Sequence, residues 1–390
     1  MKNVLVYLYK NQLAPTGGPL GYNYNLNAAL ERKHAQNIHF IETDKGNARK
    51  INQTVEKIPF AFLKRFVKLL KSIVRNYQRL YGSNHRAVVD LNKYDIVHFH
   101  SVSDMYSCKD DLKNYKGKVL ITSHAPDRPS LSVYNMLSDF ERKYMHWFYK
   151  KMFEMDEYAF KRADYIIFPC PEAEEPYLHN WPFYEGFRKE NDEKYKYLLT
   201  GINACSVKVP AADIRAKYGI PEDAFVVCYV GRHNEIKGYD LLKEIGAELL
   251  KHENVYFLIA GKEEPMQGIK NPRWIEVGWT NDPHSLINAS DIFLLPNKET
   301  YFDLVMLEIL SLGTIVLASH TGGNKYFEKI KPNGVVQFLG KNDAVEKALA
   351  LKNMSAEEKI RMRELNKDVF AKYFTADVFA DSYLKLLDSI

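Results

Sequence analysis

The sequence predicts an α/β protein with two domains, each built on a parallel β-sheet. Three observations lead to this prediction. The chain has 390 residues, about twice the usual length of a domain. Short apolar, β-branched runs recur in both halves of the chain. The segments between these runs are long enough for crossover helices, which parallel strands require.

Buried strands are expected where a short run is apolar on both faces. In the first half these runs are Val4–Tyr9, Ile38–Glu42, Ile96–His100, Val119–Thr122 and Tyr165–Phe168. In the second half they are Phe225–Val230, Val255–Ala260, Trp274–Val277, Ile292–Leu295, Ile315–Ala318 and Val335–Phe338. Helical patterns such as Tyr239–Lys251 and Leu304–Leu312 separate them, which is typical of a parallel sheet.

The stretch Leu198–Pro210 has little periodicity and predicts the domain boundary. We therefore expect residues 1–200 and 201–369 to form two Rossmann-like domains facing a central cleft. A final helix, Phe370–Ile390, has no strand after it and is expected to cross back to the first domain. Ligands of such sheets bind beyond the carboxyl ends of the strands, so the residues after each strand are the candidates for chemistry.

Composition excludes several classes of protein. A net charge of +5 is small for this length and gives no sign of a nucleic-acid partner. The four cysteines form no C-x-x-C pair, which argues against a zinc site or a disulfide framework and favours a reducing cytoplasm. No apolar run reaches the roughly 20 residues of a membrane span, and Val4–Leu8 is too short for a signal segment. Contact with a membrane is therefore expected only at its surface.

A first motif, Gly231–Gly238, follows the strand Phe225–Val230 and precedes a helix. We expect Gly231 to allow a tight turn, and Arg232 and Lys237 to meet a diphosphate at the helix N-terminus. A solvated loop with two unrelated cations is the alternative.

A second motif, Thr300–Glu308, follows the strand Ile292–Leu295. Apolar spacing starts a helix near Asp303, whose free amides are expected to face the cleft. Glu308 is placed to bind the two hydroxyls of a ribose, although a surface glutamate is the commoner use of such a position.

Three weaker signals lie at other strand ends. Gly322-Gly323 permits a close backbone approach, or simply a tight turn. Gly17 and Gly18 follow the first strand but do not have the spacing of the dinucleotide fingerprint. His124 ends the strand Val119–Thr122, where it either contacts a substrate hydroxyl or packs as a capping histidine.

In this order along the chain, these elements resemble retaining glycosyltransferase family 4, whose fold is the two-domain GT-B type. The resemblance is strongest from Phe225 to Asn324. It implies a glycosyltransferase that takes a UDP- or GDP-linked sugar and a glycan or lipid-linked acceptor, in the synthesis of cell-surface polysaccharide or glycoconjugate. It further implies an N-terminal acceptor domain, a C-terminal donor domain, retention of anomeric configuration, and no cofactor or metal.

The resemblance also assigns roles to residues. Arg232 and Lys237 would neutralise the donor diphosphate, Glu308 would hold the ribose, and His124 would contact the donor sugar. Gly17 and Gly18 would lie near the phosphate. The remaining donor contacts would come from the two motifs after the later strands, with amides from Phe302 to Val305, Leu304 included, at the helix N-terminus and the turn Gly322-Gly323.

One departure from the family pattern concerns its first glutamate. Thr300 stands at that position, Glu299 lies one residue earlier, and Asp303 replaces a usual glycine. Glu299, Thr300 or Asp303 is then left to contact the sugar, and an aspartate beside a diphosphate costs Coulomb energy.

The stretch Ile58–Tyr81 carries basic residues, no acidic residue, and apolar residues at helical spacing. This pattern favours an interfacial helix on an anionic membrane, on the inner face of the plasma membrane. The alternative is an ordinary domain helix whose basic face is solvated or binds an acidic acceptor. Two other functions stay open: a nucleotide-sugar epimerase of the same architecture, and a non-catalytic partner subunit, which the missing glutamate would suit.

Overall fold

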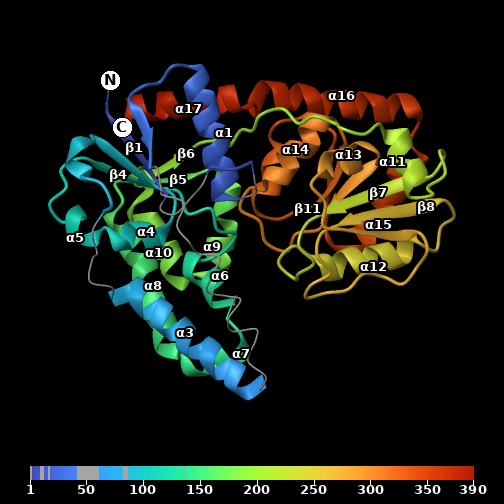
Figure 1. Ribbon diagram of the computed structural model, residues 1–390. Coiled ribbons are helices and arrows are strands. Elements are labelled where there is room, and N and C mark those ends of the chain that lie inside the picture. The colour runs from blue at the N-terminus through green and yellow to red at the C-terminus, as the bar shows by residue number, and fades with distance from the viewer. Residues whose placement is uncertain (1, 9–12, 16–17, 42–60, 82–86, 136) are drawn as a thin grey trace. The chain divides into compact units, whose positions relative to one another are not determined.

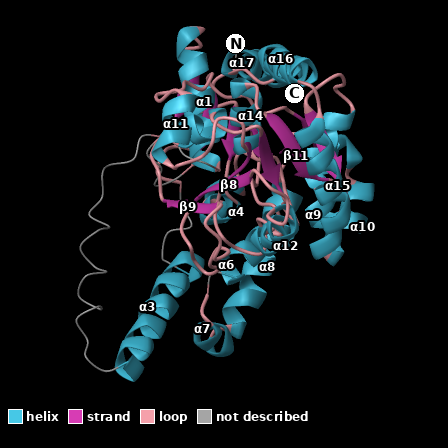
Figure 2. Ribbon diagram, turned by 90° about the vertical axis from the view of Figure 1, so that its right-hand side faces the viewer, coloured by secondary structure: helices cyan, strands magenta, loops and turns pink. Residues whose placement is uncertain are grey.

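The computed structural model describes residues 2–8, 13–15, 18–41, 61–81, 87–135 and 137–390. These residues form two compact units (Figure 1). Unit 1 comprises Met1–Phe168, Tyr177–Tyr197 and Leu387–Ile390, and unit 2 comprises Pro169–Pro176 and Leu198–Leu386. Each unit contains one parallel sheet with helices. Figure 2 distinguishes the helices and strands by colour.

Unit 1 contains a six-stranded sheet in the order β2-β1-β3-β4-β5-β6. Every pair of neighbouring strands is parallel. The strands are β1 (Val4–Tyr7), β2 (Ile38–Phe40), β3 (Ile96–Phe99), β4 (Lys118–Ile121), β5 (Tyr165–Phe168) and β6 (Tyr195–Tyr197). The central strands β1 and β3 are buried along their whole length, as apolar runs covered on both faces must be.

The helices of the first half connect these strands. They are α1 (Pro19–Arg32), α3 (Ala61–Tyr81), η1 (Leu91–Lys93), α4 (Val102–Ser107), α5 (Lys109–Leu112), α6 (Pro129–Asn135), α7 (Asp139–Tyr144), α8 (His146–Arg162), α9 (Glu175–Asn180), α10 (Pro182–Glu190) and η3 (Asp192–Lys194). The helix α3 lies beside α4, α7 and α8. No helix among the described residues is long and apolar enough to cross a membrane.

Unit 2 contains a second six-stranded parallel sheet in the order β12-β11-β10-β7-β8-β9. The strands are β7 (Phe225–Val230), β8 (Val255–Ala260), β9 (Trp274–Gly278), β10 (Ile292–Leu295), β11 (Ile315–Ser319) and β12 (Val335–Phe338). Numbered from its own first strand, this is the doubly wound Rossmann order, whose direction reverses between β7 and β10. Val227, Phe257 and Leu294, from three adjacent strands, are fully buried in its core.

The remaining helices belong mainly to unit 2. They are η2 (Pro171–Glu174), α11 (Ala211–Lys217), α12 (Tyr239–Leu249), α13 (Pro283–Asn288), α14 (Leu304–Leu312), η4 (Gly322–Glu328), α15 (Gly340–Asn353), α16 (Ala356–Tyr373) and α17 (Ala376–Ser389). The expected final helix Phe370–Ile390 is present as α17, but it begins at Ala376 rather than at Phe370. The chain breaks between α16 and α17, where Thr375 forms a parallel bridge with Ile202.

The predicted fold class is confirmed, since both halves contain a parallel Rossmann-like sheet. All the predicted strands are present, with ends that differ by a residue or two where they are described. The sequence did not predict β6, whose three residues, Tyr195–Tyr197, include a lysine and become more exposed toward the end of the strand. Its position at the sheet edge explains why an apolar run was not needed there.

Candidate functional site

Two strand-end regions, one in each unit, are candidate sites. In an open parallel sheet, ligands bind beyond the carboxyl ends of the strands, at the point where the strand order reverses. In unit 2 this point lies between β7 and β10, so the loops 231–238 and 296–303 flank it. In unit 1 it lies between β1 and β3, flanked by Leu8 and by the His100–Ser101 segment.

The loop 231–238 is held in shape by its own hydrogen bonds. Tyr229 donates its hydroxyl to the carbonyl oxygen of Arg232 (2.8 Å), and the Lys237 amide donates to Asn234 Oδ1 (3.0 Å). The essential glycine is Gly238 rather than the predicted Gly231. Gly238 has a φ of 66°, and a Cβ there would lie 1.7 Å from the Pro296 carbonyl oxygen. This contact packs the loop after β7 against the loop after β10.

Lys237 and Arg232 lie in different surroundings. The Lys237 ammonium lies 2.7 and 2.6 Å from the two carboxylate oxygens of Asp303, to which Asn297 also donates a hydrogen bond. Arg232 is exposed, and its guanidinium makes no hydrogen bond or ion pair with any described residue. The loop therefore has one cation, Arg232, without an ion-pair partner among the described residues, and one, Lys237, that a carboxylate neutralises.

The segment 299–303 packs against the glycine turn after β11. Gly323 donates its amide to Thr300 O (3.3 Å), and a Cβ on Gly322, at φ 43°, would lie 2.0 Å from the same oxygen. Thr300 is fully buried, and its hydroxyl has no partner among the described residues. Glu299 is half-buried. The Phe302 ring stacks on Phe327, so only its backbone faces the loop.

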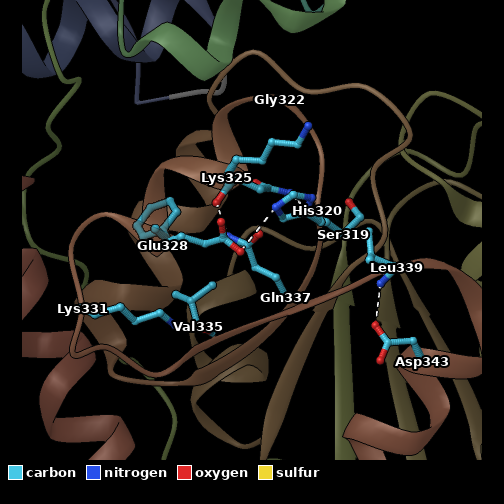
Figure 3. Close-up of polar contacts among 12 residues, drawn as sticks. Ser319, His320, Gly322, Lys325, Glu328, Lys331, Val335, Gln337, Leu339 and Asp343 are labelled. Atoms are coloured by element: carbon cyan, nitrogen blue, oxygen red, sulfur yellow. Dashed lines mark hydrogen bonds and ion pairs between the residues drawn. The ribbon is translucent and has the colours of Figure 1, made fainter.

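The amides of the glycine turn are already bonded within unit 2. The Gly322 amide donates to Glu175 Oε1 (3.2 Å), and Lys325 forms an ion pair with the same carboxylate. Figure 3 shows the residues on both sides of this turn, where His320 Nε2 lies 3.3 Å from Glu328 Oε1. An oxygen of a nucleotide-sugar donor would therefore have to displace Glu175 as the hydrogen-bond acceptor of the Gly322 amide.

Glu308 lies in the second turn of α14 and faces α13. Its carboxylate is 3.6 Å from His284 Nε2. Hydrogen bonds that His284 donates to Cys205 and Glu308 raise the pKa of His284 to about 10, so the imidazole is charged at neutral pH.

In unit 1, Gly18 and His124 adopt backbone conformations that favour glycine. Gly18 has a φ of 72° and caps α1, whereas Gly17 lies outside the described residues. His124 has a φ of 58°, which is uncommon for a residue with a side chain and often marks a functional position.

Two further histidines, His98 and His100, form a row with His124. His98 Nε2 lies 2.9 Å from Thr122 Oγ1, and the rings of His98 and His100 are 4.2 Å apart. His100 Nδ1 lies 2.7 Å from His124 Nε2. Burial lowers the pKa of His98 and of His124 to about 3, and that of His100 well below its ordinary value. All three are therefore neutral near pH 7.

Sequence reasoning missed the residues that contact the predicted site residues His124, Asp303 and Glu308. His98 in β3 and His100 directly after it follow an i, i+2 spacing, which places both on one face of the extended chain and was a usable signal. Asn297 and His284 carry no such signal, because only the fold brings them to Asp303 and Glu308. No cluster of residues able to hold a metal occurs in the described part of the chain, and independence from metal stays a prediction.

The comparisons with known proteins agree with this architecture. Residues 17–186 match the family described as Glycosyltransferase Family 4, and residues 224–357 match Glycosyl transferases group 1. The lipopolysaccharide core biosynthesis glycosyltransferase LpsE of Rhizobium meliloti is 30% identical over 192 residues, which are 47% of this chain and 55% of that protein. The chain spans about half the length of the first curated relatives it matches.

Solved structures share the fold at low identity. Sucrose-phosphate synthase from Thermosynechococcus elongatus superposes with a TM-score of 0.64 at 20% identity, covering 99% of this chain and 98% of that one. HepE of Anabaena, solved with UDP-glucose, superposes with a TM-score of 0.62 at 13% identity, over 100% of both chains. The chain therefore belongs to glycosyltransferase family 4, among the group 1 glycosyl transferases, and has the GT-B fold.

Proposed function

We propose that this chain is a retaining glycosyltransferase that moves a sugar from a UDP- or GDP-linked donor to a glycan or lipid-linked acceptor. The process served would be the synthesis of cell-surface polysaccharide or glycoconjugate. The observation that carries the proposal is the junction of β7 and β10, where Arg232, Lys237 and the N-terminus of α14 meet at the reversal of the strand order. Cations and free helix amides at this point suit a diphosphate.

In this proposal residues 201–369 bind the donor. Arg232 and Lys237 stabilise the negative charge that develops on the leaving diphosphate, with amides of Phe302 and Leu304. Glu308 accepts hydrogen bonds from the ribose. The Gly322-Gly323 turn packs closely against the backbone of Thr300. Glu299, Thr300 and Asp303 are the candidates for contact with the sugar.

Residues 1–200 bind the acceptor and supply two groups for the donor. Gly18 caps the start of α1, where amides suit a phosphate, and Gly17, which lies outside the described residues, is proposed to take part as well. His124 contacts the donor sugar as a neutral hydrogen-bonding partner, which its lowered pKa supports. No metal or cofactor is required, since the cations and amides carry the charge of the leaving group. The lipopolysaccharide role in the name of LpsE and the UDP-glucose in the HepE structure support this class of reaction.

A non-catalytic partner subunit is the second candidate. Two observations favour it: threonine at position 300, and the pairing of Lys237 with Asp303, which offsets one of the two cations. Such a subunit would bind a nucleotide sugar without turning it over.

We further propose that α3 rests on the inner face of the plasma membrane. One edge of its apolar face is covered, with Leu69 and Ile73 packed into the cluster around Phe148. The rest points outward: Phe62, Phe66 and Leu70 are 73%, 44% and 46% exposed. Its basic side chains lie on the opposite side and make no ion pair with a described carboxylate: Lys64, Arg65, Lys68 and Lys71. Residues 58–60 of the predicted stretch lie outside the described residues.

A thermal-shift screen against UDP, GDP, ADP and their sugars tests the donor assignment. A ligand at about 100 times its Kd stabilises the native state by about 2.7 kcal/mol. We expect one nucleotide to raise Tm in the wild type and not in a variant lacking both Arg232 and Lys237. An equal shift in that variant would place the nucleotide elsewhere. Release of nucleotide from the stabilising donor then separates an enzyme from a binding subunit.

A further inference from the structure

The strand-end region of unit 1 contains a cavity of about 480 Å³, within the size range of small-molecule sites. It opens at the reversal of the strand order, between the residue after β1 and the segment after β3. Its walls are largely apolar, with Leu20, Val102, Met152 and Met155 among the lining residues. His124 lines it as well, so the cavity adjoins the position proposed for the donor sugar.

A buried carboxylate, Asp156, also lines this cavity. The side chain is fully shielded from solvent. Its Oδ2 accepts hydrogen bonds from Arg128 Nε (2.9 Å), from the Ser130 amide (3.2 Å) and from the Ser130 hydroxyl. Its Oδ1 has no hydrogen-bond partner among the described residues. Since an unpaired buried carboxylate oxygen is costly, a group that donates a hydrogen bond to Oδ1 would be bound favourably.

The charge of Asp156 is only partly balanced within the fold. The Arg128 guanidinium lies 3.3 Å above the Phe153 ring and 4.9 Å from that of Trp181, which fixes its position. Burial raises the pKa of Asp156 to about 6, while the bonds from Ser130 and Arg128 lower it, so the carboxylate is ionised at pH 7 and above.

A second unsatisfied polar atom lies in the same lining. His100 Nε2 is buried and has no hydrogen-bond partner among the described residues, while its Nδ1 is bonded to His124. The described residues of the lining include no lysine or arginine. The cavity thus offers an anionic acceptor, neutral imidazoles and apolar walls, and no cationic side chain among its described lining residues.

We propose that this cavity is the acceptor subsite for an uncharged sugar ring. Asp156 Oδ1 accepts a hydrogen bond from a ring hydroxyl, His100 Nε2 bonds a second polar group, and the C–H face of the ring packs against Met152 and Met155. This inference rests on the proposed function, because it assigns the acceptor end of the same reaction. It further specifies that the sugar accepting the transfer is neutral, whatever charged or lipid group is attached beyond it.

The test is binding of simple glycosides to the full chain by ligand-observed saturation-transfer NMR, at about 10 mM. The neutral probes are methyl glucoside and methyl N-acetylglucosaminide, and the anionic probes are glucose 6-phosphate and methyl glucuronide. We expect the wild type to bind at least one neutral probe and neither anionic probe. Binding of an anionic probe that equals or exceeds that of the neutral probes would overturn the proposal, as would no binding of any neutral probe.

Two variants locate the binding. Asp156→Asn keeps the size of the side chain and removes the charge, which should weaken neutral-probe binding about tenfold or more. Val102→Phe fills the cavity from a half-buried position without touching Asp156, and should abolish binding even if Asp156→Asn does not fold. Val207→Phe enlarges an exposed valine in unit 2 and is the matched control. Unchanged binding in Val102→Phe contradicts the proposal.

Donor chemistry measured in the same samples separates this inference from the proposed function. Hydrolysis of the nucleotide sugar by water should persist in Val102→Phe while transfer to the glycoside is lost. If the wild type binds neutral glycosides but turns over no nucleotide sugar, the proposed function fails and the acceptor role of the cavity fails with it. If donors are turned over but no glycoside binds, only this inference is wrong.

Discussion

Arg232 and Lys237 are single residues whose surroundings predict different consequences of substitution. Arg232 is exposed and uncommitted within the described part of the chain, so Arg232→Ala should remove one charged hydrogen bond to the diphosphate, worth about 1.5–3 kcal/mol. Lys237→Ala should remove a similar contact and also leave Asp303 without its cation. Both variants should fold and lose donor kcat/KM about tenfold or more. A wild-type rate in either would show that the diphosphate contact is misassigned.

Asp303 is predicted to weaken donor binding, because it pairs with the Lys237 ammonium. Because its carboxylate lies 2.6 Å from the Lys237 ammonium, the diphosphate must compete with it. Asp303→Asn keeps the side-chain size and should lower the donor KM, and the gain should vanish when Lys237 is also replaced by alanine. A double-mutant cycle measures this coupling. If Asp303→Asn instead raises the donor KM as much as Lys237→Ala does, Asp303 itself contacts the donor.

Glu308 is expected to act on binding rather than on chemistry. A contact with ribose exists in both the ground state and the transition state, so Glu308→Gln should raise the donor KM more than it lowers kcat. His284→Gln removes the nearby imidazolium, 3.6 Å away, and leaves the carboxylate in place, so its effect on the donor KM should be smaller. Steady-state kinetics over donor concentration decide this, and an unchanged KM in Glu308→Gln contradicts the role.

The buried histidines predict how stability depends on pH. The pKa values of His98 and His124 are lowered from 6.5 to about 3, so the unfolded chain binds protons that the native state does not. Their contribution to stability is complete above pH 6.5 and is lost as the pH falls from 6.5 toward 3, at up to about 1.4 kcal/mol per histidine per pH unit. Asp156, whose pKa is raised to about 6, acts in the opposite direction between pH 6 and 4.

Urea denaturation at several pH values between 7 and 4.5 measures this dependence. His98→Gln can keep a hydrogen bond to Thr122. It should reduce the slope of the unfolding free energy against pH by the contribution of one histidine. His252→Gln, at an exposed position, should leave the dependence unchanged. If His98→Gln keeps the wild-type slope, then His98 titrates equally in the folded and unfolded states.

At the residue scale, the sequence indicated where the cations lie but not what they touch. A strand end followed by glycine, arginine and lysine was enough to single out Arg232 and Lys237, because each strand of a parallel sheet ends at the same edge. The pairing of Lys237 with Asp303 joins residues 66 positions apart and depends on the adjacency of β7 and β10. No local pattern encodes such a contact.

At the scale of elements, α3 is predicted to bind anionic membranes. Each basic residue near such a surface is worth about 1 kcal/mol, and the exposed apolar side chains add insertion energy. Replacing Lys64, Arg65, Lys68 and Lys71 with glutamine should reduce sedimentation with anionic vesicles, and added salt should do the same by screening. Replacing Phe62, Phe66 and Leu70 with serine should reduce binding even at low salt.

Neutral vesicles and activity on a short water-soluble acceptor are the controls for α3. Weak binding to neutral vesicles and unchanged soluble activity in both variants would confirm a surface role for the helix. A wild-type protein that ignores anionic vesicles at low salt would show that α3 is an ordinary domain helix.

Elements with strong periodicity were predicted closely, and those set by tertiary contacts were not. Leu304–Leu312 has the predicted ends, and the predicted strands end within a residue or two of the observed ones, because buried apolar runs define them. The break between α16 and α17 was missed because it depends on the bridge from Thr375 to Ile202, over 170 residues away. The need for glycine at position 238 likewise arises from Pro296, on another loop.

At the scale of the whole molecule, both units place their candidate groups where the strand order reverses. In unit 2 this position brings together Arg232, Lys237 and the start of α14, and in unit 1 it brings together His124, His100 and the Asp156 cavity. The same rule of parallel sheets therefore accounts for both regions. Length and repeated apolar runs predicted the two sheets, whereas the cavity depends on α8 covering the strand ends and could not be inferred from pattern alone.

Turnover of α-linked UDP- and GDP-sugars, followed by proton NMR, tests the central claim most directly. The purified chain is incubated with each donor and a neutral methyl glycoside, and the anomeric proton of the first-formed product is recorded. The account predicts release of one nucleotide, an α-configured product, and loss of both in the variant lacking Arg232 and Lys237. A β-configured product, or no turnover of a donor that the chain binds, would contradict it.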